Sequence, residues 1–538
     1  MSDVLLYDTT LRDGAQTEGI SFSADDKVKV ARKLDDLGVR YLEGGFSAPT
    51  NRTDMEFFQR LRERPLKHAR LAVFAMTRRA GLTPEDDPGL RNLVALGAPV
   101  AALVAKTWDL HVTAVLRVSP DENLAMIRDS VRYVKGQGLE VVFDAEHFFD
   151  GLKQNPDYAL ECLRAAVEAG ADWICLCDTN GGALPHEVEK AVRSLRRSIK
   201  AKLGIHAHND SDLAIANTLA AVEAGCTMVQ GTINGYGERC GTANLCSVVP
   251  DLQLKMNRQC LAQEQLAQLY DVAHYVASVA NMPPPERDPY VGRSAFAHKG
   301  GMHVDAVLKQ ARTYEHIRPE LVGNERRHLI SDQAGRHAVI FKSQALALGL
   351  DKDSPQAQAI MARMKEMEHA GYQFEGAEAS FELMVRKSVG LYRPRFELEG
   401  FRVIVEKDRA GAITTEATIK LHVDGEAEHT AAEGDGPVHA LDNALRKALE
   451  RFYPELKGIR LTDFKVRVVD APEQATAAAV RVMVESRAGA QTWTTIGVHT
   501  NIIEASWQAL VDGVEYGLLQ LMERGVQSNG LQLDQPEA

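Results

Sequence analysis

Two histidines with the spacing of a metal site lie in the first half of the chain. His206 and His208 stand in the segment LGIHAHND (203–210), which the apolar pattern predicts to be a β-strand. Side chains at i and i+2 of a strand leave the same face, so both imidazoles can reach one cation. Such a pair is as often a surface or packed pair as a metal site. Its place at the carboxyl end of a predicted barrel strand, where barrel active sites lie, favours the metal site.

An acidic partner for this pair stands in the first predicted loop, DTTLRDG (8–14). Two neutral imidazoles leave the charge of a divalent cation unbalanced, and we expect Asp13 to supply the missing carboxylate. Asp8 ends the preceding strand and is expected to orient backbone amides or the neighbouring arginine instead. This ligand set favours Zn²⁺, Mn²⁺, Fe²⁺ or Co²⁺ and leaves Mg²⁺ open.

Further polar side chains are expected near the same site. Arg12 puts a permanent cation beside the predicted metal, where an oxyanion would form on a substrate carbonyl, although pairing with an Asp for structural reasons is the alternative. Other side chains at predicted strand ends are candidates for acid–base work or substrate positioning, with loop capping as the alternative. These are Glu43, Asp144, Glu146 and Thr179.

Two other motifs are not expected to carry chemistry. Cys175 and Cys177 alternate on a predicted strand, but two thiols without a second pair do not make a structural zinc site, and buried cysteines usually pack. The glycine-rich GYGERCG (235–241) follows the last predicted barrel strand and lacks the spacing of a dinucleotide-binding loop. A turn over the mouth of the active site is expected there.

These residues require a scaffold that brings distant loops together, and the first 235 residues predict one. Short apolar runs alternate with segments of helical period, as in repeated βα units. We expect eight strands at residues 4–8, 40–46, 69–76, 100–107, 139–147, 173–179, 203–210 and 227–235.

The helices between these strands have clear ends. Ser23, Ser119 and Asn155 open three of them in N-cap position, and a glycine closes each. Eight βα units of this total length predict a TIM (β/α)₈ barrel, an α/β fold. A doubly wound open sheet is the alternative, but it usually has fewer strands and a glycine-rich turn after the first one.

A chain of 538 residues exceeds what a single core supports, roughly 250–300 residues, so further domains are expected. The proline-rich MPPPERDPYVGR (282–293) ends the predicted catalytic barrel at residues 1–282, and a mostly helical linker follows at 283–395. Residues 396–525 repeat a pattern of three strands and one helix, which predicts an α+β domain of two βββα halves. The polar tail at 526–538 is expected to be flexible.

Composition limits the partners and the compartment. The net charge of −12 and the pI near 5.8 argue against nucleic acid as a partner. The N-terminus lacks the pattern of a signal peptide, and no apolar run reaches the length of a membrane span, so no membrane association is expected. Seven scattered cysteines fit a reducing compartment, and we expect a cytoplasmic protein.

Four segments together resemble a known enzyme family. DTTLRDG, HAHND, GERCGTANL (237–245) and HKGGMHVDAV (298–307) are similar to motifs of the DRE-TIM metallolyases, and within them to the acetyl-CoA-condensing synthases of 2-isopropylmalate, homocitrate and citramalate. LYDTTLRDGAQTEGISFS, AKTWDLHV and VVFDAEHFFDG most resemble the (R)-citramalate synthases. The resemblance extends to the duplicated C-terminal domain, which is similar to the regulatory domain of such synthases.

The resemblance implies roles for individual residues. Asp13, His206 and His208 would bind the metal, Arg12 would stabilise the developing alkoxide, and Asp144, Glu146 and Thr179 would contact or position substrates. In such synthases a linker region reaches the active site of the partner subunit. His303 and Tyr314 match positions of that region; His303 would help to remove a proton from the acetyl-CoA methyl group, and Tyr314 would bind substrate.

Two positions differ from the usual pattern of the family. Related synthases carry a metal-binding Asn directly after the GER-x-G turn, where this chain has Thr242, with Asn244 two residues later. The fourth protein ligand is therefore Thr242, Asn244 or none. GGFSAPTNRTD (44–54) also replaces a segment that usually contains Trp-Pro-Gly, which bears on substrate choice.

The resemblance thus implies a metal-dependent acyltransferase that condenses acetyl-CoA with pyruvate for isoleucine biosynthesis. 2-Isopropylmalate synthase, which uses 2-oxoisovalerate, is the alternative. An aldol-type lyase or carboxyltransferase on the same barrel is disfavoured, because such chains lack the duplicated C-terminal domain. Family resemblance further implies a homodimer or larger homo-oligomer and feedback inhibition by isoleucine. The other reading of the C-terminal domain is dimerisation alone.

Overall fold

The protein is described by a computed structural model that covers residues 4–283, 285–328, 354–469, 478–489 and 491–530. The chain divides into two compact units, each described by itself below. The first comprises the residues up to Ala297 together with Glu315–Arg327, and the second comprises His298–Tyr314 and the chain from His328 onwards.

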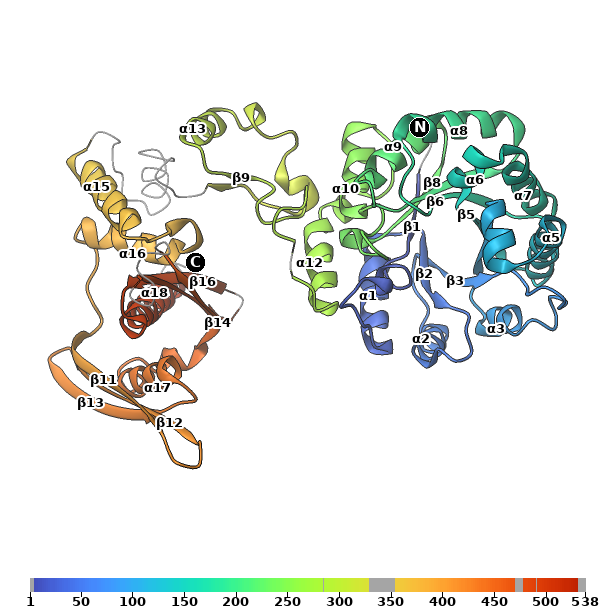
Figure 1. Ribbon diagram of the computed structural model, residues 1–538. Coiled ribbons are helices and arrows are strands. Elements are labelled where there is room, and N and C mark those ends of the chain that lie inside the picture. The colour runs from blue at the N-terminus through green and yellow to red at the C-terminus, as the bar shows by residue number, and fades with distance from the viewer. Residues whose placement is uncertain (1–3, 284, 329–353, 470–477, 490, 531–538) are drawn as a thin grey trace, which may run out of the picture. The chain divides into compact units, whose positions relative to one another are not determined.

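The first unit contains the predicted barrel. Eight parallel strands pair in sequence order, and β8 closes the ring by pairing with β1, in the register Leu5 with Met228. The fold class predicted from the sequence is therefore confirmed. Figure 1 shows the strands surrounded by helices. The strands are β1 (Leu5–Asp8), β2 (Tyr41–Phe46), β3 (Arg70–Met76), β4 (Val100–Lys106), β5 (Glu140–Glu146), β6 (Trp173–Asp178), β7 (Lys202–Ala207) and β8 (Met228–Gly231).

Helices follow the strands, and side-chain caps fix where several begin. Ser23 and Asp26 form a reciprocal capping box at the start of α1, and the side chains of Ser119 and Asn155 accept from backbone amides at the starts of α5 and α7. The larger helices are α1 (Ala24–Leu37), α2 (Arg52–Glu63), α3 (Pro88–Leu96), α5 (Pro120–Gly136), α7 (Pro156–Glu168), α8 (Pro185–Ser198), α9 (Ala214–Ala224) and α12 (Leu269–Val279); shorter ones are α4 (Asp109–His111), α6 (Phe148–Gln154), α10 (Leu245–Pro250) and α11 (Gln263–Leu266).

Alternation along each strand separates two apolar layers. Leu203, Ile205 and Ala207 of β7 belong to the large core between strands and helices. The residues between them therefore face the barrel interior, where a smaller cluster includes Cys175 and Cys177 of β6. This parity turns His206 inward, as the sequence predicts.

The second unit begins with a helical region and ends with two similar halves. Each half is a three-stranded antiparallel sheet followed by one helix, which matches the predicted βββα repeat. The elements are α13 (Gly301–Lys309), α15 (Pro355–His369), α16 (Glu378–Ser388), β11 (Glu397–Lys407), β12 (Ile413–Val423), β13 (Glu426–Glu433), α17 (Pro437–Leu449), β14 (Ile459–Val468), β15 (Val480–Ala488), β16 (Gln491–His499) and α18 (Ile502–Gly530). A short sheet pairs β9 (Ala297–His298) with β10 (Arg327–His328).

The two C-terminal halves share one core. Leu441 and Leu445 of α17, Ile419 of β12, Val482 of β15 and Leu510 of α18 all belong to a single buried cluster. The exact domain boundaries expected from the sequence stay a prediction, and the tail from residue 531 lies outside the described residues. Among the described helices, none is long and apolar enough to cross a membrane. All seven cysteines are free thiols, and the cytoplasmic location stays a prediction.

Candidate metal centre and barrel mouth

Three buried side chains converge at the carboxyl ends of β1 and β7. Ligand atoms of Asp13, His206 and His208 all lie within 4.8 Å of one another. His206 Nε2 is 3.2 Å from Asp13 Oδ2, and the two imidazole rings have centroids 5.1 Å apart. The structure thus brings together the three residues that the sequence singles out as metal ligands.

A hydrogen-bonded chain from neighbouring strands orients His206. Its Nδ1 lies 2.9 Å from Gln230 Oε1, and Gln230 Nε2 donates to Asp144 Oδ1 at 3.0 Å. Since an amide oxygen can only accept, the proton of His206 sits on Nδ1 and its Nε2 lone pair faces Asp13. Gln230, which sequence reasoning missed, therefore prepares His206 for a cation.

The electrostatics of the cluster follow from burial and charge. Burial alone would raise the pKa of Asp13, but the adjacent Arg12 charge and His206 together hold that pKa well below its usual range. Burial and the charge of His206 lower the pKa of His208 to about 4. His206 is also buried, which lowers its pKa, but the adjacent Asp13 carboxylate outweighs burial and raises this pKa above the usual value. Asp13 is thus ionised and His208 neutral, as metal ligands must be.

The donor set fits a divalent cation. Asp13 Oδ2 and His208 Nδ1 are buried without a hydrogen-bond partner among the described residues. Buried polar atoms are rarely left unpaired, so these two atoms point to a missing positive partner.

A second group of possible ligands, Asp144 with Cys175 and Cys177, is equally buried. There, burial raises the pKa of the Cys175 thiol well above normal, so a thiolate ligand is disfavoured.

Arg12 is held rigidly beside the cluster. Its Nε donates to Glu43 Oε1, while Tyr7 donates to the other oxygen of the same carboxylate at 2.7 Å. The guanidinium carbon lies 4.0 Å from the centroid of the Phe74 ring. Arg12 Nη1 is 4.0 Å from Asp13 Oδ2, which leaves this end of the guanidinium directed towards the cluster. Glu43 therefore orients Arg12 from the end of β2.

Asp8 organises the loop that carries Arg12 and Asp13. Its carboxylate accepts from the backbone amide and from the hydroxyl of Thr10, both at 2.9 Å. Thr10 Oγ1 in turn accepts from the amide of Ile233 at 2.9 Å, which ties the first loop to the last one of the barrel. Burial raises the pKa of Asp8 to about 7. This arrangement matches the expected role of Asp8 in orienting backbone amides.

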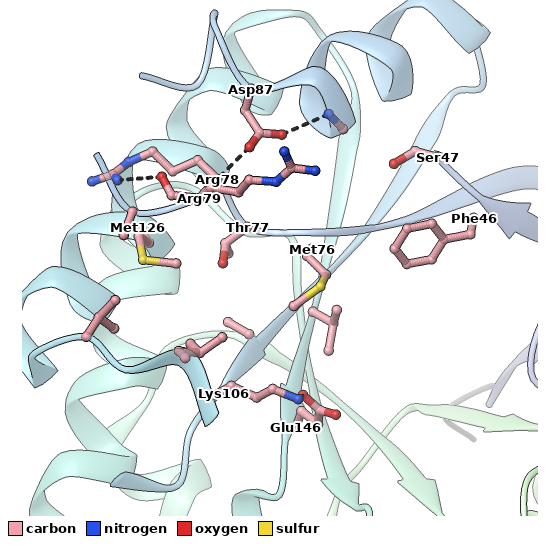
Figure 2. Close-up of a pocket in the computed structure, with 16 residues that line it drawn as sticks. Phe46, Ser47, Met76, Thr77, Arg78, Arg79, Asp87, Lys106, Met126 and Glu146 are labelled. Carbon is pink, nitrogen blue, oxygen red and sulfur yellow. Dashed lines mark hydrogen bonds and ion pairs between the residues drawn. The ribbon is translucent and has the colours of Figure 1, made fainter. Parts of the chain in front are cut away.

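A second polar centre lies at the ends of β4 and β5. Lys106 and Glu146 are register partners on these strands and form an ion pair. Both line a pocket of about 270 Å³ with apolar walls that include Phe46, Met76 and Met126. Figure 2 shows the ammonium and carboxylate turned towards each other. Asp144 points into the same barrel interior, and burial followed by the charge of Glu43 raises its pKa to about 7.

Loops after β4, β5 and β6 complete this side of the mouth. Thr179 Oγ1 accepts from the amide of His147, at 2.8 Å, so its hydroxyl supports the β5 loop. His147 adopts a left-handed backbone with φ of 58°, and its ring lies 4.1 Å from that of His111. His147 Nδ1 is 3.2 Å from Asp150 Oδ2. Sequence reasoning missed both histidines, although AKTWDLHV and DAEHFFDG place them within the segments that follow β4 and β5.

The expected fourth-ligand positions are both engaged in local structure. Asn244 Oδ1 accepts from the Cys246 amide at 2.9 Å and caps α10. Thr242 is buried, and its hydroxyl lies 3.2 Å from Tyr236 O. The GERCG turn closes so tightly that a Cβ on Gly241 would come within 1.9 Å of Gly235 O. The turn lies over the end of β7, where Asn209 N donates to Gly241 O at 2.9 Å.

His303 and Tyr314 lie in the second unit. Their rings are stacked with centroids 4.2 Å apart, and both side chains are exposed. The structure thus places the two residues next to each other, and their part in an active site stays a prediction.

Comparison with known proteins follows the same division of the chain. Residues 3–276 match the HMGL-like family model, 290–371 the homocitrate synthase post-HMGL domain-like model, and 375–518 the LeuA allosteric (dimerisation) domain. A protein of Geobacter sulfurreducens named (R)-citramalate synthase is 52% identical over 96% of this chain and 98% of its own length.

Two further relatives extend the comparison. A protein of the same name from Aquifex aeolicus is 50% identical over 97% of this chain and 99% of its own length. A Methanopyrus kandleri protein named as a probable 2-isopropylmalate synthase is 32% identical over 95% of this chain and 97% of its own. The chain therefore belongs to the (R)-citramalate synthase family of acetyl-CoA-condensing, HMGL-like acyltransferases.

Proposed function

We propose that this protein condenses acetyl-CoA with pyruvate and hydrolyses the resulting thioester, releasing (R)-citramalate and CoA for isoleucine biosynthesis. The observation that carries this choice is the identity of about half of the residues, over nearly the whole chain, with relatives named for that reaction. The chemistry of the barrel mouth supports the same reaction type.

Asp13, His206 and His208 would hold the divalent cation on which this family depends, with Mn²⁺, Zn²⁺, Mg²⁺ and Co²⁺ all compatible with the donors. The two buried atoms without partners support this assignment. When bound, the cation supplies Lewis acidity towards the carbonyl of a 2-oxo acid. Because Asn244 caps a helix and Thr242 bonds within its turn, we favour a site without a fourth protein ligand.

The remaining residues of the mouth bind and orient the reactants. Arg12, directed by Glu43, lies where its guanidinium can stabilise the alkoxide that forms from the keto oxygen. Glu146 and Thr179 position the substrates at the ends of β5 and β6. Asp144 supports His206 through Gln230 and borders the substrate space.

The base that removes the methyl proton of acetyl-CoA would come from the second unit. We assign it to His303, with Tyr314 stacked on its ring, supplied by the partner subunit of a homodimer. The match of residues 375–518 to an allosteric dimerisation domain supports both the dimer and a regulatory ligand, for which isoleucine is our proposal. The bound cation, the inhibitor and the cytoplasmic location are each open to direct measurement.

A panel of 2-oxo acids with acetyl-CoA tests the proposal. The purified protein, supplied in turn with each candidate cation, is assayed for CoA thiol release with pyruvate, 2-oxoisovalerate and 2-oxoglutarate. Pyruvate should give the highest kcat/KM. A higher value with 2-oxoisovalerate would identify a 2-isopropylmalate synthase instead, and turnover without thiol release would indicate a lyase. Isoleucine should inhibit or raise the melting temperature, and no effect on either would remove the regulatory proposal.

A further inference from the structure

The ion pair between Lys106 and Glu146 differs from an ordinary structural pair. Its side chains are 14% and 23% exposed, and both line the 270 Å³ pocket at the barrel mouth. Burying two charges is costly, and an apolar pair of similar size often stabilises a fold equally well. An ion pair at the edge of a cavity, on two strands that end at the barrel mouth, is therefore a candidate for function.

The pair also has unused hydrogen-bonding capacity. A lysine ammonium offers three donors, and Glu146 offers two acceptor oxygens. Among the residues that the structure describes, Lys106 Nζ contacts one carboxylate oxygen, Glu146 Oε2, and Glu146 Oε1 has no protein donor. The main chain around the pair is fixed, since Thr107 N and Oγ1 both donate to Glu146 O. A donor and an acceptor are thus held side by side and face the pocket.

A lysine pair at the opposite end of the barrel provides a comparison. Lys135 Nζ is 2.8 Å from Asp172 Oδ2, which also accepts from the amide of Val141 at 2.7 Å. The Asp172 carboxylate therefore binds the main chain at the amino end of β5. It does not line the pocket that Lys106 lines. The Lys135 pair fastens α5 to the sheet, whereas the Lys106 pair has no such attachment through its carboxylate.

We propose that Lys106 is a catalytic residue of the hydrolytic half of the reaction, binding the thioester carbonyl oxygen while Glu146 acts on the attacking water. This inference rests on the proposed condensation, which delivers a CoA thioester to the mouth. The apolar walls formed by Phe46, Met76 and Met126 suit the carbon chain of such a thioester, and Figure 2 shows the charged pair at one end of this pocket.

The hydrolysis balances without any further reagent. Water adds through its oxygen to the thioester carbon as Glu146 accepts one of its protons, and Lys106 donates to the oxyanion that forms. The C–S bond then breaks, and Glu146 returns the proton to the leaving sulfur, which departs as the CoA thiol. The second proton of the water dissociates from the new carboxyl group, and Lys106 keeps its own proton throughout.

The test separates the two halves of the reaction. Wild type, Lys106→Met, Lys106→Arg and Lys135→Met are compared for hydrolysis of the synthetic CoA thioester of citramalate. Acid-quenched reactions of acetyl-CoA and pyruvate are also analysed by mass spectrometry for condensed thioester and free thiol. Losing one donor to an oxyanion typically costs about 10²–10³-fold in kcat, so Lys106→Met should slow hydrolysis by that factor and accumulate condensed thioester. Lys106→Arg should retain activity within about tenfold, and Lys135→Met should match wild type.

Several results would overturn the inference. A hydrolysis rate in Lys106→Met equal to that of wild type would do so. So would a loss of thiol release in Lys106→Met without accumulation of condensed thioester, or an equal loss of hydrolysis in Lys135→Met. If Lys106→Met melts at a markedly lower temperature than Lys135→Met, Lys106→Leu, which also lacks a donor, takes its place under the same criteria. If wild type instead prefers another 2-oxo acid, the proposed substrate fails, and the Lys106 comparison is made with the condensed thioester of that acid.

Discussion

The polar groups at the ends of β1 and β7 form a buried cluster, the closed side of the mouth, whereas the ion pair at the ends of β4 and β5, the open side, borders a pocket. His206 lies between Asp13 and Gln230, and Asp13, His206 and His208 are only 1%, 5% and 7% exposed. Lys106 and Glu146 instead contact each other and face a pocket. A closed arrangement suits a resident cation, whose ligands must not move. An open pair suits groups that exchange partners as substrate binds.

Removal of the carboxylate from the closed side should have the largest effect. Asp13→Asn keeps the shape but removes the charge that balances the cation. We expect the variant to lose bound metal and at least roughly 10³-fold in kcat, since a metal Lewis acid supplies several kcal/mol. Metal per chain after dialysis, measured by mass spectrometry, and thiol release check this. The control is Cys177→Ala, in the other group of possible ligands, which should keep its metal. If Cys177→Ala loses metal while Asp13→Asn retains it, the metal is bound by the other group.

Replacement of Arg12 should have the second largest effect on activity. In Arg12→Lys the charge remains, but a lysine cannot both bond to Glu43 and lie over the Phe74 ring as the guanidinium does. We expect kcat to fall about 10²–10³-fold with a smaller change in the KM for pyruvate, because the lost interaction acts on a developing oxyanion. Metal content should stay at the wild-type level. An increase in KM at unchanged kcat would assign Arg12 to ground-state binding.

The closed side could be predicted largely from the sequence because its signals are local. His206 and His208 stand in one apolar segment, where period-two alternation alone puts both on one face, and Asp13 stands in the loop after the first strand. The barrel could be predicted for the same reason, since each of its strands is one apolar run in the sequence. The predicted strands at 203–210 and 227–235 are too long, because β7 ends at Ala207 and β8 at Gly231. Beyond these ends the GERCG turn and the residues just after it supply the backbone partners, as in the bonds from Asn209 N to Gly241 O and from Thr232 N to Ala243 O.

The open side could not be predicted in full because it depends on register between strands. Glu146 stands out as a charge at a strand end, but its pairing with Lys106 requires the alignment of β4 with β5. The signal available was a lysine ending the apolar run VAALVAK, at the position equivalent to Glu146 on the next strand. Gln230 was missed for a similar reason, since its role depends on the neighbouring strand that carries His206.

Loss of the orienting amide should weaken the closed side without abolishing it. Gln230→Leu removes the acceptor for His206 Nδ1 and the donor to Asp144. Loss of such a supporting partner typically costs about 10–100-fold in metal affinity, which titration calorimetry of the metal-free protein would measure. At saturating metal, kcat should recover most of the wild-type value. Gln253→Leu, which removes two hydrogen bonds to Leu261 away from the mouth, should leave metal affinity unchanged. Equal affinities of Gln230→Leu and wild type would show that the ring of His206 needs no support.

The smallest effect concerns the acid stability of the metal-free protein. Burial and the charge of His206 lower the pKa of His208 from 6.5 to about 4 in the folded state. Between these values the unfolded chain binds a proton that the folded chain does not, so stability falls as pH falls through this window, by at most about 1.4 kcal/mol per pH unit. His208→Gln should therefore lose less stability than wild type between pH 6.5 and 4.5 in urea titrations of metal-free protein. His206, whose pKa is raised, acts in the opposite direction but is present in both chains, so the difference between them reports on His208. If the unfolding free energies of wild type and His208→Gln depend on pH in the same way, His208 takes up its proton in the folded state as readily as in the unfolded chain. The metal cluster would then be reached by water, as the Lys106 pair is.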